Sequence, residues 1–245
     1  FIHLAGVGIQ SGNNLTCYEP GVPYMPFGSV FWFEEGISSM VMSDGGWNWK
    51  ILPITPFEKS LTKRTGKFKL TEDGTLEGHA RVEYYGHEAI TKRRDHFTET
   101  PEKRAETFKE SVRSRVSTAE VTNVTVSDFD DNEKPVAVDY DVKVPNYAQR
   151  TGKRLFFQPV YFEYGVPPAF SSATRTYGVY FSYPWSEDDN VEITLPDNFT
   201  GESVISPSSI DDPDGVGSLH VSFYILKESN RLNVSRQFHF GGGGH

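Results

Sequence analysis

The sequence predicts a mainly β fold, an antiparallel β-sheet or sandwich with one packed α-helix. Aromatic residues, which favour strands, make up 14% of the chain. The chain also holds 22 glycines and 15 prolines, a content typical of turns between strands. Several stretches alternate apolar and polar residues, as a strand with one buried face does. These patterns exclude a helical bundle and a disordered chain.

The composition also limits the classes of function. The 245 residues suffice for one large or two small domains. A formal net charge of −9 has the wrong sign for neutralising phosphates, so we expect no nucleic-acid partner. The single cysteine, Cys17, excludes an intrachain disulfide and a multi-cysteine zinc site. No apolar run approaches the roughly 18–20 residues that span a bilayer, and no motif indicates a cofactor or a metal.

Residues 1–60 are expected to form short strands without a helix. Glycine, proline and asparagine separate runs of aromatic and β-branched residues. These runs are residues 2–9, 29–33, 37–42 and 47–52. Pro53 and Pro56 then break strand pairing and indicate a connector. We therefore predict a boundary near residue 60, with domains at 1–60 and 61–245.

The second domain is predicted to begin with a hairpin and one helix. Residues 67–70 and 76–85 flank a turn, and the second run alternates apolar and polar residues. Thr100 and Pro101 are a typical helix start, and basic residues stand near the far end. The helix is expected to run from about 101 to 116. Its apolar stripe would pack on the sheet and consists of Ala105, Phe108, Val112 and Val116.

The rest of the chain is predicted to be strands. The expected strands are residues 120–127, 136–144, 155–158, 177–183, 191–195, 218–226 and 232–240. Residues 230–240 should pair with 217–227. We expect an uncovered edge beside this hairpin to contact another polypeptide, such as a further copy of the chain. The chain starts at Phe1 and ends at His245, after four glycines that follow a predicted strand, so we expect a processed chain or part of a longer one.

Two groups of polar residues contain side chains that can bind metal ions, but for each group an interpretation without a metal is favoured. Oxygen-bearing residues alternate in 128–132, as a calcium loop requires, but Glu133 replaces the obligatory glycine and a strand follows. A solvated turn is therefore predicted there. His79, His87 and His96 lie eight and nine residues apart, which matches no metal-binding pattern, so surface positions are expected.

His3 and Glu19 are the candidate catalytic residues. His3 begins one strand-like segment and Glu19 ends the next, so a hairpin could place their side chains together. A carboxylate there would orient the imidazole, which is the base half of a thiol or hydroxyl nucleophile system. Cys17 shares a strand face with Glu19 and stands at no helix start, so it is predicted to be a small buried residue and not a nucleophile.

The same residues resemble the closing part of a transglutaminase-like domain of the papain fold. The resemblance rests on residues 1–5, 17–21 and 26–28, where His3 takes the histidine place and Glu19 stands where aspartate is usual. It continues in residues 36–53, 76–78, 145–152, 183–189 and 240–244, which resemble exported bacterial proteins, especially acidobacterial ones, with β-rich domains of unknown function around a transglutaminase-like domain. It implies a periplasmic or extracellular location, a catalytic cysteine upstream of the histidine, and closing papain-like strands in residues 1–60.

Two functions follow as hypotheses. The first is a non-catalytic exported binding or structural subunit whose partner is another protein or the remainder of the same precursor. Aromatic residues cluster at 31–33 and at Trp47 and Trp49, and they could form its contact surface, although alternate aromatics in a strand more often face a core. The second is a thiol-dependent acyl transferase or peptidase whose cysteine lies upstream of this chain. A cysteine at a helix start before Phe1 would favour the enzyme.

Overall fold

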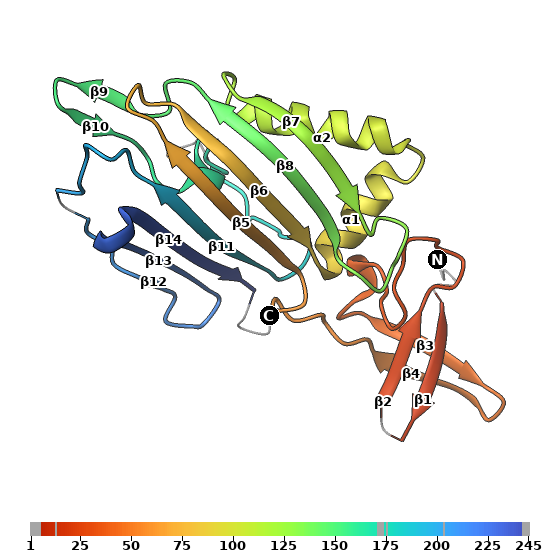
Figure 1. The fold of residues 1–245 in the computed structure, drawn as a ribbon. Helices are drawn as coiled ribbons and strands as arrows, with labels where there is room; N and C mark the ends of the chain where they lie inside the picture. Colours follow the sequence, from red (N-terminus) through yellow and green to blue (C-terminus); the bar gives the residue numbers. More distant parts are fainter. Residues whose placement is uncertain (1–5, 13, 171–173, 175, 203, 242–245) are drawn as a thin grey trace.

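A mixed β-sheet and two helices make up most of the molecule. The structure, a computed structural model, describes residues 6–12, 14–170, 174, 176–202 and 204–241. Strands account for 42% and helices for 15%, which confirms a mainly β fold. Figure 1 shows the large sheet with both helices beside it, and two short hairpins that project from its end.

The large sheet has eight strands in the order β12-β13-β14-β11-β5-β6-β8-β7. Its strands are β5 (Leu61–Leu70), β6 (Leu76–Tyr84), β7 (Glu120–Ser127), β8 (Val136–Val144), β11 (Trp185–Thr194), β12 (Ile210–Asp211), β13 (Gly217–Leu226) and β14 (Arg231–Phe240). All neighbours are antiparallel except β5 and β11, which are parallel. The prediction of a purely antiparallel sheet or sandwich is therefore wrong at this central pair. Parallel neighbours need a long crossover connection, whereas a short hairpin can join antiparallel neighbours.

Two helices pack on one face of the sheet, whereas the sequence predicts one. The expected helix is confirmed as α2 (Pro101–Arg115), and the Thr100 side chain caps it by accepting from the Lys103 amide at 3.3 Å. The missed helix is α1 (Gly86–His96), which has no side-chain N-cap. Besides Ala89 and Ile90, its buried residues are the polar His87 and Arg93, so its sequence lacks an apolar stripe.

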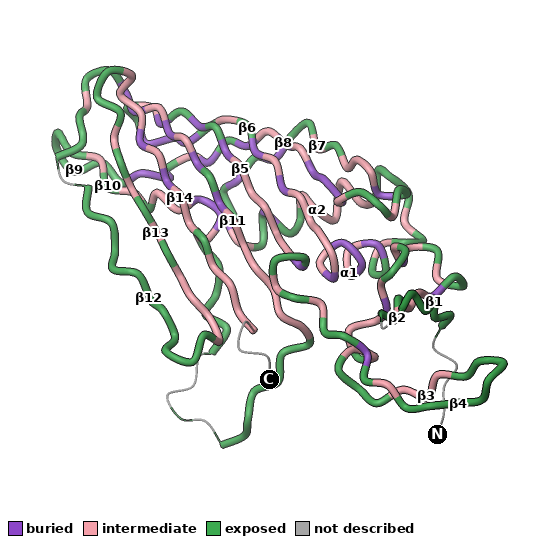
Figure 2. The backbone as a smooth tube through the Cα atoms, turned by 90° about the horizontal axis from the view of Figure 1, so that it is seen from below, coloured by how far each residue is buried: buried purple, intermediate pink, exposed green. Residues whose placement is uncertain are grey.

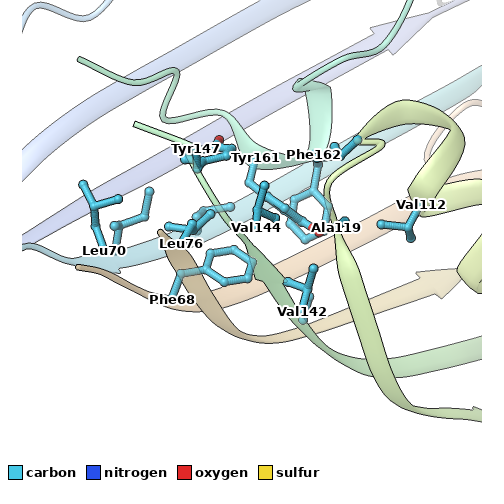
Figure 3. Close-up of a cluster of buried hydrophobic side chains, with 14 of the residues drawn as sticks. Phe68, Leu70, Leu76, Val112, Ala119, Val142, Val144, Tyr147, Tyr161 and Phe162 are labelled. Atoms are coloured by element: carbon cyan, nitrogen blue, oxygen red, sulfur yellow. The ribbon is translucent and has the colours of Figure 1, made fainter. Parts of the chain in front are cut away.

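The core lies between the helices and the sheet and continues under a crossing segment. That segment contains a 3-10 turn, η2 (Tyr161–Glu163), which follows the β9–β10 hairpin (Gln149–Thr151 and Arg154–Phe156). Figure 3 shows Tyr161 and Phe162 among side chains of the sheet and α2. The Phe68 and Tyr161 rings are 4.6 Å apart, an aromatic contact typical of a packed core.

The N-terminal region forms two separate hairpins. They are β1 (Val7–Ser11) with β2 (Asn14–Tyr18), and β3 (Ser38–Ser43) with β4 (Gly46–Ile51). The strands expected at 37–42 and 47–52 are thus confirmed, whereas 29–33 is wrong because η1 (Trp32–Glu34) is a 3-10 turn. Figure 2 shows little burial in β3 and β4, because a lone two-stranded hairpin encloses no core.

The C-terminal hairpin is confirmed, because β13 and β14 pair along all ten residues of each. β12 pairs with only two residues of β13, so most of that edge lacks a strand partner in the described part of the chain. The expected strand at 177–183 is wrong, since these residues are irregular. No helix among the described residues is long and apolar enough to cross a membrane.

Candidate functional site

Glu19 is the only one of the two predicted catalytic residues that can be placed, because His3 lies outside the described residues. Glu19 follows the last residue of β2 and is 7% exposed. One of its carboxylate oxygens accepts the Phe31 amide at 3.2 Å. The pairing of His3 with Glu19 therefore stays a prediction.

A second carboxyl group, which the sequence analysis missed, lies beside Glu19. It belongs to Glu34 in η1, and its Oε2 atom is buried without a hydrogen-bond partner among the described residues. Burial first and the adjacent Glu34 side chain second raise the pKa of Glu19, which reaches about 7 although the hydrogen bond from the Phe31 amide lowers it. Two carboxyl groups this close do not both ionise readily, so the pair holds a proton up to neutral pH.

Cys17 is a poor nucleophile in this setting. Its pKa is raised, first by burial and then by the negative charge of Glu34, while Lys50 lowers it by a smaller amount. The reactive form of cysteine is the thiolate, which this environment disfavours. Cys17 is half-buried on β2, so the predicted burial is only partial.

We expect Glu19→Gln to stabilise the chain at alkaline pH. The unfolded state ionises Glu19 near pH 4.3 and the folded state near 7, so wild-type stability falls as pH rises between these values. Glutamine does not ionise, so its advantage should be absent at pH 4 and reach about 1–2 kcal/mol at pH 8 after allowance for solvent screening.

Urea unfolding followed by tryptophan fluorescence can measure this difference, because three of the four tryptophans lie in residues 32–49. Glu58→Gln, at an exposed position, is the matched control and should show no pH-dependent gain. An advantage of Glu19→Gln that is equal at both pH values would contradict the raised pKa.

A buried histidine–glutamate pair joins the N-terminal region to α1. His87 is 3% exposed, so the prediction of a surface position is wrong for this histidine. Its Nε2 atom lies 2.9 Å from a Glu35 oxygen, and Glu35 also accepts the Thr55 amide at 2.9 Å. Burial by itself would raise the pKa of Glu35, but these hydrogen bonds outweigh it and lower the pKa. The Tyr183 ring packs 4.8 Å from the imidazole. The contact of His87 with Glu35 links α1 to the segment that contains η1, so the cluster serves as an anchor between them.

The acidic loop at 128–134 is organised around Arg93, which is 1% exposed. The guanidinium donates to four main-chain carbonyls at 2.6–2.9 Å, those of Asp128, Phe129, Asp131 and Lys134. Lys134 in turn pairs with the side chains of Asp128 and Asp131. The Arg93 guanidinium thus binds the carbonyl oxygens that a metal ion in this loop would need. In the part of the chain that the structure describes, no group of three or more histidine, cysteine or acidic side chains could hold a metal ion.

A cluster of five charged residues is buried between the sheet and η2. Arg64 contacts Asp189 at 2.5 Å, Glu163 at 2.7 Å and Glu187 at 2.8 Å, and Arg236 contacts the same three carboxylates. Within the cluster every member pairs with a member of opposite charge. The cluster fixes η2 against the sheet.

The comparisons with known proteins cover part of this architecture. Residues 153–242 match the family model of a domain of unknown function with a solved structure, DUF3858. The matched stretch runs from β10 to β14 and so includes β11, β13 and β14 of the large sheet. No curated protein and no solved structure matches the chain significantly. The resemblance to transglutaminase-like proteins stays a prediction.

Proposed function

We propose that the chain is a non-catalytic, exported binding or structural subunit derived from a transglutaminase-like protein, and that the β3–β4 hairpin docks onto its protein partner. The observation that carries the proposal is the exposure of Trp47 (66%) and Trp49 (58%). The core was the favoured expectation for these two tryptophans, over a contact surface. Exposed apolar side chains that cluster on one face are typical of protein-binding surfaces.

The register of the hairpin gathers these side chains on one face, which we call the β3–β4 apolar face. Met42 pairs with Trp47 and Met40 with Trp49, and the two indole rings lie 6.5 Å apart. Ile51 follows on the same face and is largely exposed. The opposite face carries Asn48 and Lys50. A covering polypeptide would bury the apolar face and would stabilise a hairpin that is marginal alone.

The partner that we propose is the part of a transglutaminase-like protein in which the active enzymes carry their catalytic cysteine, on the same precursor or on a separate chain. The resemblance of residues 1–5 and 17–21 supports this choice, because it assigns residues 1–60 to the closing strands of a papain-like domain. In such a domain the hairpins would pack on the segment that starts with the cysteine-bearing helix. The same resemblance supports a periplasmic or extracellular location.

A thiol-dependent acyl transferase or peptidase is the second candidate, with its cysteine upstream of this chain. The buried position of Glu19, fixed by the Phe31 amide, favours it, because a carboxylate held in this way can orient a histidine. The raised pKa of Cys17 disfavours a nucleophile within this chain. Both functions therefore need the same partner segment and differ in whether its cysteine is present.

Photo-crosslinking from the β3–β4 apolar face tests the proposal. A photoreactive phenylalanine replaces Trp49 in the natural host, and the crosslinked peptide is identified by mass spectrometry. We expect a crosslink to a transglutaminase-like segment, because burial of Trp49 requires a polypeptide within side-chain reach. The same substitution at Glu228, an exposed position in a distant turn, is the matched control and should give no such product.

The sequence of the crosslinked segment separates the two candidates. A segment without the cysteine supports the subunit, whereas a cysteine at a helix start, with acyl-transfer activity that His3→Ala abolishes, supports the enzyme. If no polypeptide is crosslinked from position 49, the β3–β4 apolar face has no protein partner.

A further inference from the structure

The side of the large sheet that faces away from the helices carries mostly polar side chains, and the Phe57 ring covers it at His239. We call the side chains of β5, β6, β8, β11, β13 and β14 that point to this side the polar face. Along each of these strands the alternate residues that face the helix side are the less exposed set, and those of the polar face are the more exposed set. Both helices contact the other side.

The pairing of the strands aligns the polar face into rows that cross the sheet. One row runs across six strands and consists of Tyr224, Asn233, Glu192, Lys67, His79 and Asp141. The adjacent row consists of Ser222, Ser235, Asn190, Thr65, Arg81 and Asp139. With neighbouring strands about 4.8 Å apart, each row is roughly 24 Å long. The rows line a hollow of about 450 Å³ that extends from His79 to Tyr224.

The charges in this hollow neutralise one another. Arg81 pairs with Asp139 and with Glu83, and Glu192 pairs with Arg231 at 2.9 Å. The lining residues include two cationic side chains, those of Lys67 and Arg81, and two anionic ones, those of Asp139 and Glu192. A balanced surface of this kind gives no electrostatic attraction to a polyanion, so a nucleic acid or an acidic lipid surface does not fit it.

Hydrogen-bond donors nevertheless remain without partners in the hollow. The Nδ2 atom of Asn233 is buried and has no hydrogen-bond partner among the described residues. Lys67 has no ion-pair partner in the part of the chain that the structure describes, and it lies in the same row. A buried amide without a partner costs free energy, and rotation of the Asn233 side chain into the hollow would let an acceptor oxygen of a ligand pair with it.

An extended peptide and an apolar ligand fit this surface less well than a sugar does. The main chains of β5, β11 and β14 pair on both sides, so a peptide finds no open strand edge here. On the polar face the large exposed apolar residues are Tyr224, at 54%, and Leu226. The polar face carries hydroxyl, amide and paired charged groups, which can both donate to and accept from sugar hydroxyls. The Tyr224 ring offers a flat surface for the C–H groups of a sugar ring.

We propose that the polar face binds a neutral oligosaccharide that lies across the strands, with Asn233 and Tyr224 as its principal contacts. The site is separate from the β3–β4 apolar face, so it could serve the subunit or the enzyme alike. Its ligand would span several sugar units, because the rows cross six strands.

Titration of the chain with three neutral hexasaccharides tests the proposal, namely cellohexaose, chitohexaose and mannohexaose, with hexagalacturonate as a charged comparison. We expect at least one neutral probe to bind with a dissociation constant of roughly 10 μM to 1 mM in calorimetry. Asn233→Ala and Tyr224→Ala should each weaken that binding by about fivefold to tenfold. Lys103→Ala, on α2 at the other side of the sheet, is the matched control and should leave it unchanged.

Amide chemical-shift changes in the wild type keep the test independent of how well the variants fold. The changes should be confined to the two rows of the polar face and their neighbours. Absence of binding by all three neutral probes would overturn the proposal, as would binding that leaves the shifts of β11 and β14 unchanged. Binding of hexagalacturonate alone, lost in high salt and in Lys67→Ala, would assign an anion site and would also overturn it.

Discussion

Arg64→Met is expected to lower the free energy of unfolding by about 3–5 kcal/mol, because it removes one partner from a buried ionic cluster. Arg64 donates through Nε and Nη2 to Asp189, and its Nη2 atom also contacts Glu163 and Glu187. Without it, three carboxylates would share Arg236 as their cation. The Asp189 side chain is almost fully buried, so water cannot replace the lost guanidinium.

Urea unfolding followed by far-UV circular dichroism gives the measurement, and Lys63→Met is the matched control. Lys63 is the preceding residue of β5 and points to the polar face, so its loss should change stability by less than about 0.5 kcal/mol. The deficit of Arg64→Met should shrink at pH 4, because protonation of the carboxylates removes their unpaired negative charge. Equal midpoints for the two variants at pH 7 would show that the cluster contributes little to stability.

Local patterns in the sequence predicted the elements that local interactions determine. The start of α2 follows from Thr100 and Pro101, since the cap and the proline act within one turn. The hairpin of β13 and β14 follows from two alternating runs that a short turn joins. In both cases the stabilising contacts lie within about 25 residues of chain.

The missed features depend on contacts between distant parts of the chain. α1 buries His87 and Arg93, whose partners are Glu35 and the carbonyls of residues 128–134. No pattern within residues 86–96 shows that these partners exist, so the helix resembles a solvated basic stretch. The parallel pairing of β5 with β11 joins residues more than 120 positions apart, and neither strand shows which partner it takes.

The candidate sites show the same limit. The position of Glu19 at the end of a strand was predicted from the residues around it, whereas its neighbour Glu34 depends on a 3-10 turn where a strand was expected. The polar side chains of each strand follow from alternation, but their alignment into rows depends on the strand order. A binding surface made by six strands is therefore not visible in any one segment.

Arg93→Met is expected to lower the free energy of unfolding by about 2–4 kcal/mol and to loosen the loop at 128–134. The guanidinium satisfies carbonyls of four residues, and methionine fills a similar volume without donating to any of them. Burial lowers the pKa of Arg93, although the acidic side chains around it act in the opposite direction. Part of the free energy gained from its hydrogen bonds therefore offsets the cost of removing the guanidinium from water. Urea unfolding and amide exchange in residues 128–134 measure the two effects.

Arg94→Met is the matched control for this loop, because Arg94 is the next residue of α1, is exposed and pairs with Asp95 alone among the described side chains. Its unfolding midpoint and its loop exchange should equal those of the wild type, and an equal result for Arg93→Met would refute the role of the buried guanidinium. Calcium should leave the wild-type midpoint unchanged, because Arg93 already occupies the carbonyls and Lys134 neutralises Asp128 and Asp131. A rise in that midpoint at millimolar calcium would mean that the acidic side chains bind the ion without these carbonyls.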